Sequence, residues 1–131
     1  MADCIFCKIV VGELPSYKIY EDLKYLAFLD IFPSAEGHTL VIPKQHVEWV
    51  WDHGNVEEYF GVVAKIARHY RDLSGDVVRS NIDGWQVPHA HIHVKIGKVS
   101  DPNPKQGDPA KLRATAEKYR LYVHSGVESE Y

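Results

Sequence analysis

The sequence lacks a long hydrophobic run, an excess of basic residues and a signal-like amino terminus. Its longest apolar stretches, such as YLAFL at residues 25–29, are far shorter than the roughly 20 residues that cross a bilayer as a helix. The opening segment MADCIFCKIV has an acidic residue at position 3 and no apolar core of signal-peptide length. The formal net charge is −3, so the chain has no positive field to attract nucleic acid. These absences predict a cytoplasmic protein that binds neither membranes nor nucleic acid.

Internal repeats and low-complexity tracts are also absent. The 131 residues suffice for one compact domain and are too few for two. Hydrophobic residues make up 45% of the chain and charged residues 25%, which is ordinary for a globular protein. We therefore expect a single domain over residues 1–131.

Cysteine is scarce, with only Cys4 and Cys7 in a C-x-x-C arrangement. A thioredoxin-like redox pair normally follows a strand within a βαβ unit, and only three residues precede Cys4. Two buried thiols without further chemistry are a second interpretation. The third is one half of a zinc site, for which the eight histidines could supply two further ligands.

Alternating apolar residues and turn signals predict several short strands. Residues 16–22 and 24–30 form a candidate hairpin that turns at Glu21–Asp22. Residues 38–43 form the next strand, which Pro43 ends. Asp83–Gly84 is typical of a tight turn and would join residues 76–82 to the strand that follows.

Helical signals predict a short turn after the cysteines, ending at Gly12, and two longer helices. In residues 55–75, Asn55 and Glu58 match a capping box and Gly75 suits the position after the last turn. The predicted core-facing side of this helix consists of Val56, Tyr59, Phe60, Val63, Ile66, Ala67 and Tyr70. After an exposed loop at residues 99–109, Asp108–Pro109 predicts a last helix that ends near Gly126.

The order of these elements predicts the fold class. Strands, a helix, further strands and a second helix follow one another, with short connections between the strands. This describes an α+β domain with an antiparallel sheet of about five strands, one long central helix and a C-terminal helix.

The segment PHAHIHVKI at residues 88–96 contains three histidines at every second position. In a strand, His89, His91 and His93 would share one face, spaced by roughly 6.5–7 Å, while Ala90, Ile92 and Val94 would face the core. A polar strand face or a tag-like metal patch is the simplest alternative. A zinc site made of these three residues alone is disfavoured, because side chains in a straight row do not converge on one point.

This segment resembles the signature of the histidine triad (HIT) family, in which three histidines alternate with apolar residues. DCIFCKIVVGELPS, YEDLKYLAFLDI and EGHTLVIPKQH resemble other segments of the same family at the expected distances. The resemblance spans residues 3–96, and residues 97–131 contain no matching motif. It implies a HIT-like fold over the domain and a homodimer, for which the aromatic stretch at residues 47–54 and the following helix offer a surface.

The resemblance implies catalytic roles for four histidines. His91 matches the nucleophile, and an imidazole suits this role because its neutral form is well populated near pH 7. His93 would contact the phosphate or leaving-group oxygens and help to protonate the departing group. His38 matches a supporting histidine, although it could simply be a polar residue at the start of a strand. His89, the first of the row, would be held beside the nucleophile.

The resemblance also implies a nucleotide pocket. Asp30 would accept hydrogen bonds from both ribose hydroxyls, as a carboxylate can. Positions that sandwich the purine are matched by Phe6, Ile9, Leu14, Phe28 and Ile31, for each of which plain core packing is the alternative. In relatives, the loop before the triad supplies phosphate contacts, here expected from Asn81 and Gln86. This chain departs from the pattern there, because the loop is shorter and Trp85 occupies the usual glutamine position; Lys95 also replaces the last apolar residue of the signature.

Many relatives with the amino-terminal C-x-x-C bind structural zinc, and the matching ligands here are Cys4, Cys7, His46 and His89. Two thiolates and two imidazoles make a closed tetrahedral site. The expected function is a nucleotide hydrolase or transferase that cleaves a purine nucleoside monophosphate from an amine or phosphate leaving group through a covalent nucleotidyl-histidine. Phosphoramidase-like activity is favoured; a dinucleoside polyphosphate hydrolase and a catalytically weak nucleotide-binding module are the alternatives.

Overall fold

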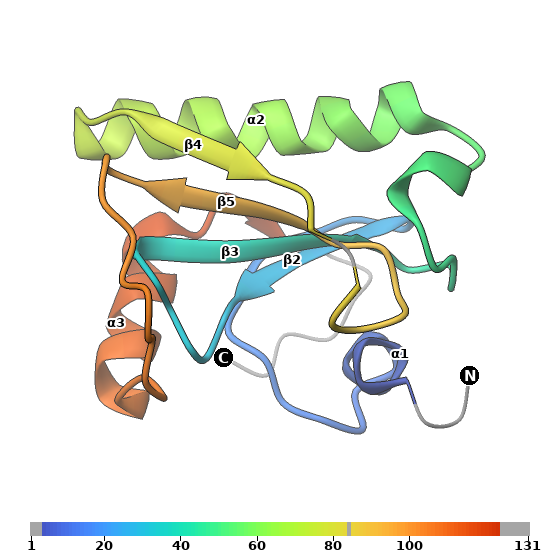
Figure 1. Cartoon of the computed structure of the whole chain (residues 1–131), viewed down its shortest axis with the longest axis horizontal. Coiled ribbons are helices and arrows are strands. Elements are labelled where there is room, and N and C mark those ends of the chain that lie inside the picture. Colours follow the sequence, from blue (N-terminus) through green and yellow to red (C-terminus); the bar gives the residue numbers. More distant parts are fainter. Residues whose placement is uncertain (1–3, 84, 124–131) are drawn as a thin grey trace.

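The computed structural model of the chain describes residues 4–83 and 85–123 and has a sheet in the order β4-β5-β3-β2-β1-β6 (Figure 1). The strands are β1 (Lys18–Glu21), β2 (Tyr25–Leu29), β3 (Glu36–Pro43), β4 (Val78–Asn81), β5 (Ile92–Ile96) and β6 (Tyr122–Val123). The helices are α1 (Ile5–Val10), the 3-10 turn η1 (Val50–Asp52), α2 (Val56–Ser74) and α3 (Pro109–Tyr119). Neighbouring strands pair antiparallel except β1 and β6, which are parallel. The predicted α+β fold class is confirmed.

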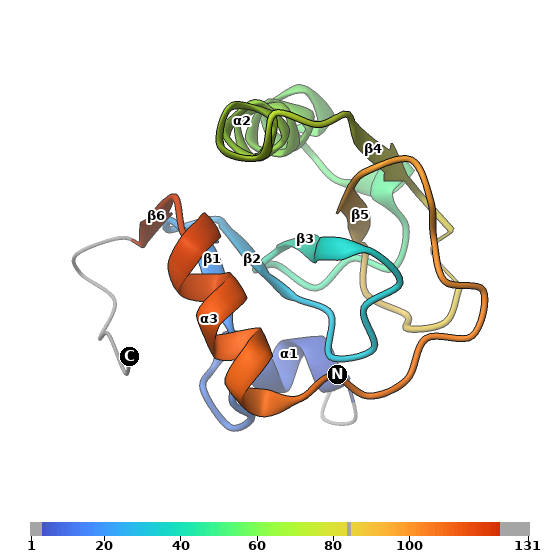
Figure 2. The same ribbon diagram turned by 90° about the vertical axis from the view of Figure 1, so that its left-hand side faces the viewer.

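The sheet separates two apolar clusters. α2 covers one face, and α1 lies against the other (Figure 2). Alternation along β2 sends Ala27 and Leu29 toward the α2 side and Leu26 and Phe28 toward the α1 side. In β5 the same alternation sends Ile92 and Val94 toward the α2 side. The histidine row therefore faces the α1 side of the sheet.

The signals at both ends of α2 are confirmed. The Asn55 side chain accepts a 2.9 Å hydrogen bond from the Glu58 backbone N–H, and Gly75 ends the helix in the left-handed conformation at φ 68°. Tyr59, Val63, Ile66 and Tyr70 are buried as predicted, and so is Val62. Phe60 was expected in the core but is 38% exposed, and Val56 and Ala67 are only half-buried. In the described ranges, no helix is long and apolar enough to cross a membrane.

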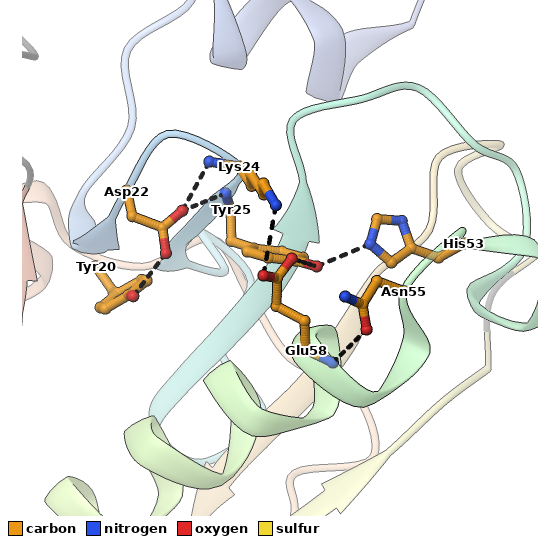
Figure 3. A network of polar contacts seen from close by, with 7 residues as sticks. All are labelled: Tyr20, Asp22, Lys24, Tyr25, His53, Asn55 and Glu58. Carbon is orange, nitrogen blue, oxygen red and sulfur yellow. Dashed lines mark hydrogen bonds and ion pairs between the residues drawn. The ribbon is translucent and has the colours of Figure 1, made fainter.

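A polar network joins the β1–β2 turn to the start of α2 (Figure 3). Asp22 accepts hydrogen bonds from the backbone N–H groups of Lys24 and Tyr25, so the turn occupies residues 22–24, just after the predicted Glu21–Asp22. The Tyr25 hydroxyl donates to Glu58 at 2.9 Å and lies 2.8 Å from His53 Nε2. These contacts hold α2 in place on the face of the sheet opposite the histidine row of residues 89–93.

The Asp83–Gly84 turn was expected to join two paired strands directly, but the structure has a longer connection between them. Asn81 pairs with His93, β5 begins only at Ile92, and the connection between β4 and β5 runs from residue 82 to residue 91. Pro88 cannot donate a ladder hydrogen bond, and the Ala90 N–H donates instead to the Val47 carbonyl at 2.7 Å. The backbone around the first two histidines is therefore held outside the sheet; Gly84 itself lies outside the described residues.

The last helix begins as predicted and ends earlier. The Asp108 side chain accepts from the Lys111 N–H and Pro109 follows, but α3 ends at Tyr119 rather than near Gly126, which lies outside the described part of the chain. The Leu121 N–H donates to the Ile19 carbonyl at 2.9 Å, and residues 122–123 then pair with β1 as β6. Pairing with the edge of the sheet replaces further helical turns there.

Candidate active site

The three histidines of the row lie on one side of the sheet, and their apolar neighbours lie on the other. Ala90, Ile92 and Val94 are fully buried in the core cluster under α2. His89 and His91 are also buried, and both rings form T-shaped pairs with Phe6 on the α1 side. The ring centroids of His91 and His93 are 5.3 Å apart. The sequence pattern therefore brings three imidazoles into one row.

His91 has a fixed tautomer. Its Nδ1 lies 2.8 Å from the backbone carbonyl of His89, and a carbonyl oxygen can only accept. Nδ1 therefore carries the hydrogen, and in the neutral ring Nε2 carries the free lone pair. This is the arrangement that a nucleophilic imidazole needs.

A chain of hydrogen bonds orients His38 and His93. The Ser34 backbone N–H donates to His38 Nδ1 at 3.0 Å, so the hydrogen of neutral His38 is on Nε2. That atom donates to His93 Nδ1 at 2.9 Å, which leaves the hydrogen of His93 on its Nε2. His93 Nε2 is buried and has no hydrogen-bond partner among the residues that the structure describes. The chain thus ends in one available N–H donor beside His91.

Burial keeps these two rings neutral. Desolvation, followed by the charges of His93 and Lys95, lowers the pKa of His38 to about 3. Desolvation, followed by the charges of His91 and Lys95, lowers the pKa of His93 to about 4. Neutral rings are the states that the hydrogen-bond chain requires.

Asp30 lies directly after β2, at the His38 end of the row. One carboxylate oxygen accepts from the Phe32 backbone N–H at 2.9 Å, and the other lies 3.6 Å from His38 Nε2. Burial raises the pKa of Asp30, while the Phe32 hydrogen bond opposes this shift. The carboxylate retains free lone pairs and is 22% exposed, so a hydroxyl-bearing ligand can reach it.

The predicted purine residues divide into two groups. Phe6, Phe28 and Ile9 lie together in the α1-side cluster, with Phe6 packed edge-on against Phe28 at 5.5 Å and against His91. Leu14 is half-buried and Ile31 is 44% exposed, and the structure does not place them in that cluster.

The predicted phosphate residues are less closely gathered. Asn81 pairs in register with His93, but its side chain donates to Asp83 at 3.1 Å. Gln86 and Trp85 are exposed. The sequence also gave no indication of Ser34, whose role depends on a backbone N–H and therefore leaves no side-chain signal.

A second cluster lies next to the first. The ligand atoms of Cys4, Cys7, His46 and His89 all lie within 4.8 Å of one another. Cys7 Sγ is 3.2 Å from His46 Nδ1, and Cys4 Sγ is 3.4 Å from His89 Nδ1. Around a tetrahedral zinc ion, sulfur and nitrogen ligands would be about 3.6 Å apart. The donor atoms therefore fit zinc in spacing and in chemical type.

The surroundings of these four residues also suit a metal. His89 Nε2 donates to the Pro43 carbonyl at 2.7 Å, which leaves Nδ1 with its lone pair directed toward the cysteines. Burial lowers the pKa of His89 and keeps the ring neutral. Burial and the neighbouring Cys4 raise the pKa of the Cys7 thiol to about 11, so two thiolates here require a nearby positive charge.

Comparison with known proteins agrees with this fold. The HIT domain model matches residues 11–99, and the chain therefore belongs to the HIT domain family. It is 45% identical over 100 residues to Protein hit of Bacillus subtilis, covering 70% of this chain and 69% of that protein. It is 35% identical over 108 residues to an adenosine 5′-monophosphoramidase of Schizosaccharomyces pombe, covering 79% of this chain and 78% of that one. The resemblance seen in the sequence is confirmed.

Solved structures of HIT proteins have a similar fold. A Hit-like protein from Bartonella henselae superposes with a TM-score of 0.83 and 30% identity, covering 92% of this chain and 96% of that chain. A zinc-bound histidine triad family protein from Mycobacterium smegmatis superposes with a TM-score of 0.69 and 34% identity, covering 89% and 95% of the two chains.

Proposed function

We propose that this protein cleaves a purine nucleoside monophosphate from an amine leaving group through a covalent nucleotidyl-histidine at His91. The observation that carries the proposal is the hydrogen bond from His91 Nδ1 to the His89 carbonyl, which leaves Nε2 as a neutral nucleophile. A phosphoramidate is favoured over a dinucleoside polyphosphate because two relatives at 35% and 37% identity are adenosine 5′-monophosphoramidases.

The first step follows from the two fixed tautomers. His91 Nε2 attacks phosphorus, a nitrogen–phosphorus bond forms, and the bond to the leaving nitrogen breaks. The His93 Nε2–H donates a hydrogen bond to that nitrogen, which takes its proton from a water molecule, so the amine leaves neutral and a hydroxide ion remains. The nucleotidylated His91 ring becomes positive beside His93, whose ring stays neutral throughout.

The second step restores the enzyme. The hydroxide ion attacks the same phosphorus, and the bond to His91 Nε2 breaks. The products are the nucleoside monophosphate and the free amine, so one water is consumed in each cycle. His38 exchanges no proton, because Ser34 already donates to its second nitrogen.

Other residues would bind the nucleotide. Asp30 would accept hydrogen bonds from the two ribose hydroxyls, and Phe6, Ile9 and Phe28 would contact the purine beside His91. Leu14 and the exposed Ile31 remain candidates for the outer side of the base. Asn81 and Gln86 remain candidates for phosphate contacts, of which Asn81 has the better support because it pairs with His93.

We also propose that Cys4, Cys7, His46 and His89 hold a structural zinc ion. When bound, the ion would supply positive charge to the two thiolates and would tie α1 to the sheet. The spacing of the donor atoms and the zinc-bound relative support this proposal.

A homodimer is proposed on the exposed aromatic residues around η1. In the stretch at residues 47–54, Val50 is buried, whereas Trp49 is 38% and Trp51 65% exposed. η1 contacts α2, whose first turns expose Phe60. Exposed aromatic side chains on these two contacting elements support a contact with a second copy.

The test is incubation with adenosine 5′-phosphoramidate labelled in the phosphate, followed by an alkaline quench and peptide mapping. Alkali is needed because phosphorus–nitrogen bonds are labile in acid. We expect label on the peptide that contains residues 89–93, and none in His91→Asn. His93→Ala is expected to slow turnover by roughly 10²–10⁴-fold while still forming the intermediate.

Two outcomes would reject the proposal. Label in His91→Asn would show that another residue is the nucleophile. Tight binding of a purine monophosphate without hydrolysis of any derivative would favour a binding module. Faster cleavage of a dinucleoside polyphosphate than of the phosphoramidate would keep His91 as the nucleophile and change the leaving group.

A further inference from the structure

The loop that carries Asp30 is held from outside by a segment distant in sequence. We call residues 30–35 the Asp30 loop and residues 101–107 the brace. The Gly107 N–H donates to the Ile31 carbonyl at 2.7 Å, and the Asp101 N–H donates to the Ser34 carbonyl at 2.7 Å. The brace lies beyond residues 11–99, which the HIT domain model matches.

We propose that the brace positions Asp30 for ribose recognition and Ser34 for orienting His38. The inference rests on the proposed function, since it assigns an outside support to two parts of that site. It makes Gly107 and Asp101 positioning residues, which contact neither the nucleotide nor the reacting atoms.

The link from Gly107 to Asp30 passes through one peptide unit. The Ile31 carbonyl that accepts from Gly107 belongs to the same planar unit as the Phe32 N–H. That N–H donates to the Asp30 carboxylate at 2.9 Å. Because the unit is rigid, a change in its orientation at the Gly107 side changes the direction of the N–H that holds Asp30.

The link from Asp101 to the histidines passes through Ser34. The Ser34 carbonyl accepts from the Asp101 N–H, while the Ser34 N–H donates to His38 Nδ1 at 3.0 Å. Losing the first bond frees Ser34 to rotate. The donor that restricts His38 to one tautomer would then be weakened.

The brace is itself anchored at both ends. Before it, Arg79 donates to the Ser100 hydroxyl at 3.0 Å and to the Gly97 carbonyl. After it, α3 packs Leu112, Ala116 and Tyr119 into the core, and the Tyr119 hydroxyl donates to Glu36 at 2.6 Å. A segment fixed at two points can hold a loop in position.

The packing at Gly107 leaves little room. A Cβ at this position would lie 3.0 Å from Leu112 Cδ1 and 3.1 Å from Cγ. The lining of a cavity of about 170 Å³ includes Asp30, His38, Gly107 and Leu112. A methyl group at residue 107 therefore requires Leu112 or the brace to shift by a few tenths of an ångström.

The first experiment measures binding and needs no turnover. The dissociation constants of AMP and 2′-deoxy-AMP are compared in the wild type, in Gly107→Ala and in the control Gly61→Ala, whose added Cβ meets nothing within 4 Å. In Gly107→Ala we expect the preference for the ribonucleotide, measured as the ratio of the two dissociation constants, to fall by about tenfold. We expect Gly61→Ala to keep that preference.

The second experiment compares Asp101→Pro, which removes the N–H donor, with Asp101→Ala, which keeps it. Long-range ¹H–¹⁵N spectra report which nitrogen of His38 carries hydrogen. The wild type and Asp101→Ala should show hydrogen on Nε2 alone, and Asp101→Pro should show a mixture. The same variant should have a lower kcat with a nearly unchanged KM.

The outcomes separate the two proposals. A wild type that binds both nucleotides equally would contradict ribose recognition by Asp30, the part of the proposed function on which the inference rests. A wild type with the preference, and a Gly107→Ala variant that retains it, would overturn the role of the brace. Equal loss of affinity for both ligands, or a pure His38 tautomer in Asp101→Pro, would reduce the brace to a stabilising segment and overturn the inference.

Discussion

His38 Nε2 lies 2.9 Å from His93 Nδ1, and this contact together with the Ser34 N–H decides which nitrogen of each ring carries hydrogen. The two residues come from β3 and β5, which are neighbouring antiparallel strands. Because Ser34 occupies the second nitrogen of His38, the contact can have only one direction of donation. The free N–H of His93 therefore depends on His38.

Replacing His38 should slow catalysis without preventing binding. In His38→Leu the donor to His93 is lost, the His93 ring can adopt either tautomer, and kcat should fall by roughly 10²-fold. His38→Gln can place an amide N–H near the same position and should recover part of the rate. Single-turnover kinetics and AMP affinity measure the two effects. A kcat that is the same in His38→Leu as in the wild type would mean that His93 needs no partner.

Local signals in the sequence predicted the parts of the fold that depend on neighbouring residues. The Asn55 cap, the Gly75 terminus and the two faces around His91 all follow from short-range rules. The 82–91 connection and β6 did not, because they depend on long-range backbone contacts, Ala90 with Val47 and Leu121 with Ile19. No periodic pattern reports such contacts.

The candidate site divides in the same way. The residue types of the row, of Asp30 and of the C-x-x-C could be predicted because their side chains carry the chemistry. The order of hydrogen bonds from Ser34 through His38 to His93 could not, since it requires β3 beside β5 and a backbone donor from a loop. The contacts of residues 101–107 with the Asp30 loop could not be predicted from the sequence for the same reason, because both donors are main-chain N–H groups.

Removing the Asp30 carboxylate should weaken the binding of ribonucleotides selectively. Losing charge-assisted hydrogen bonds to two hydroxyls costs about 1.5–3 kcal/mol, so Asp30→Ala should bind AMP roughly 10–150-fold more weakly. The affinity for 2′,3′-dideoxy-AMP should hardly change, because that ligand offers no hydroxyl to lose. Titration calorimetry with both ligands checks this. Equal losses for the two would place Asp30 away from the ribose.

Zinc should co-purify with untagged protein at one equivalent per chain. Cys4→Ser should lower both the zinc content and the melting temperature, while the affinity for AMP changes little, because the site is structural. Ile5→Ala is the matched control: Ile5 follows Cys4 on α1, is 47% exposed and offers no ligand atom. Metal analysis and thermal denaturation give the result. Untagged wild type with only a trace of zinc would contradict the proposed site.

The proposed dimer should depend on Trp51. A carboxylate in place of this 65% exposed indole would be buried in the contact, so Trp51→Glu should shift the protein to monomers. Leu23→Glu changes a side chain that is 73% exposed on the β1–β2 turn and should leave the assembly unchanged. Sedimentation velocity measures both. A wild type that sediments as a monomer, or a Trp51→Glu variant that remains dimeric, would exclude this surface.

The neutral histidines should make the protein less stable in mild acid. His38 and His93 have pKa values of about 3 and about 4 in the folded state, against an ordinary value of 6.5. Between pH 6.5 and about 4, the unfolded chain therefore binds more protons at these positions than the folded chain does. The free energy of unfolding should fall as the pH decreases through this window, and neither residue should affect it above pH 7.

Denaturant unfolding at several pH values, in the wild type and in His93→Asn, isolates one of the two residues. Asp30 acts in the opposite sense, because burial raises its pKa, and acid also protonates the metal ligands; both contributions are common to the two proteins. The variant should therefore show a shallower loss of stability between pH 6.5 and 4, by less than about 1.4 kcal/mol per pH unit. Parallel curves would mean that His93 is protonated in the folded protein as readily as in the unfolded chain. His93 would then not be held neutral by its surroundings, and the single direction of donation from His38 would not apply.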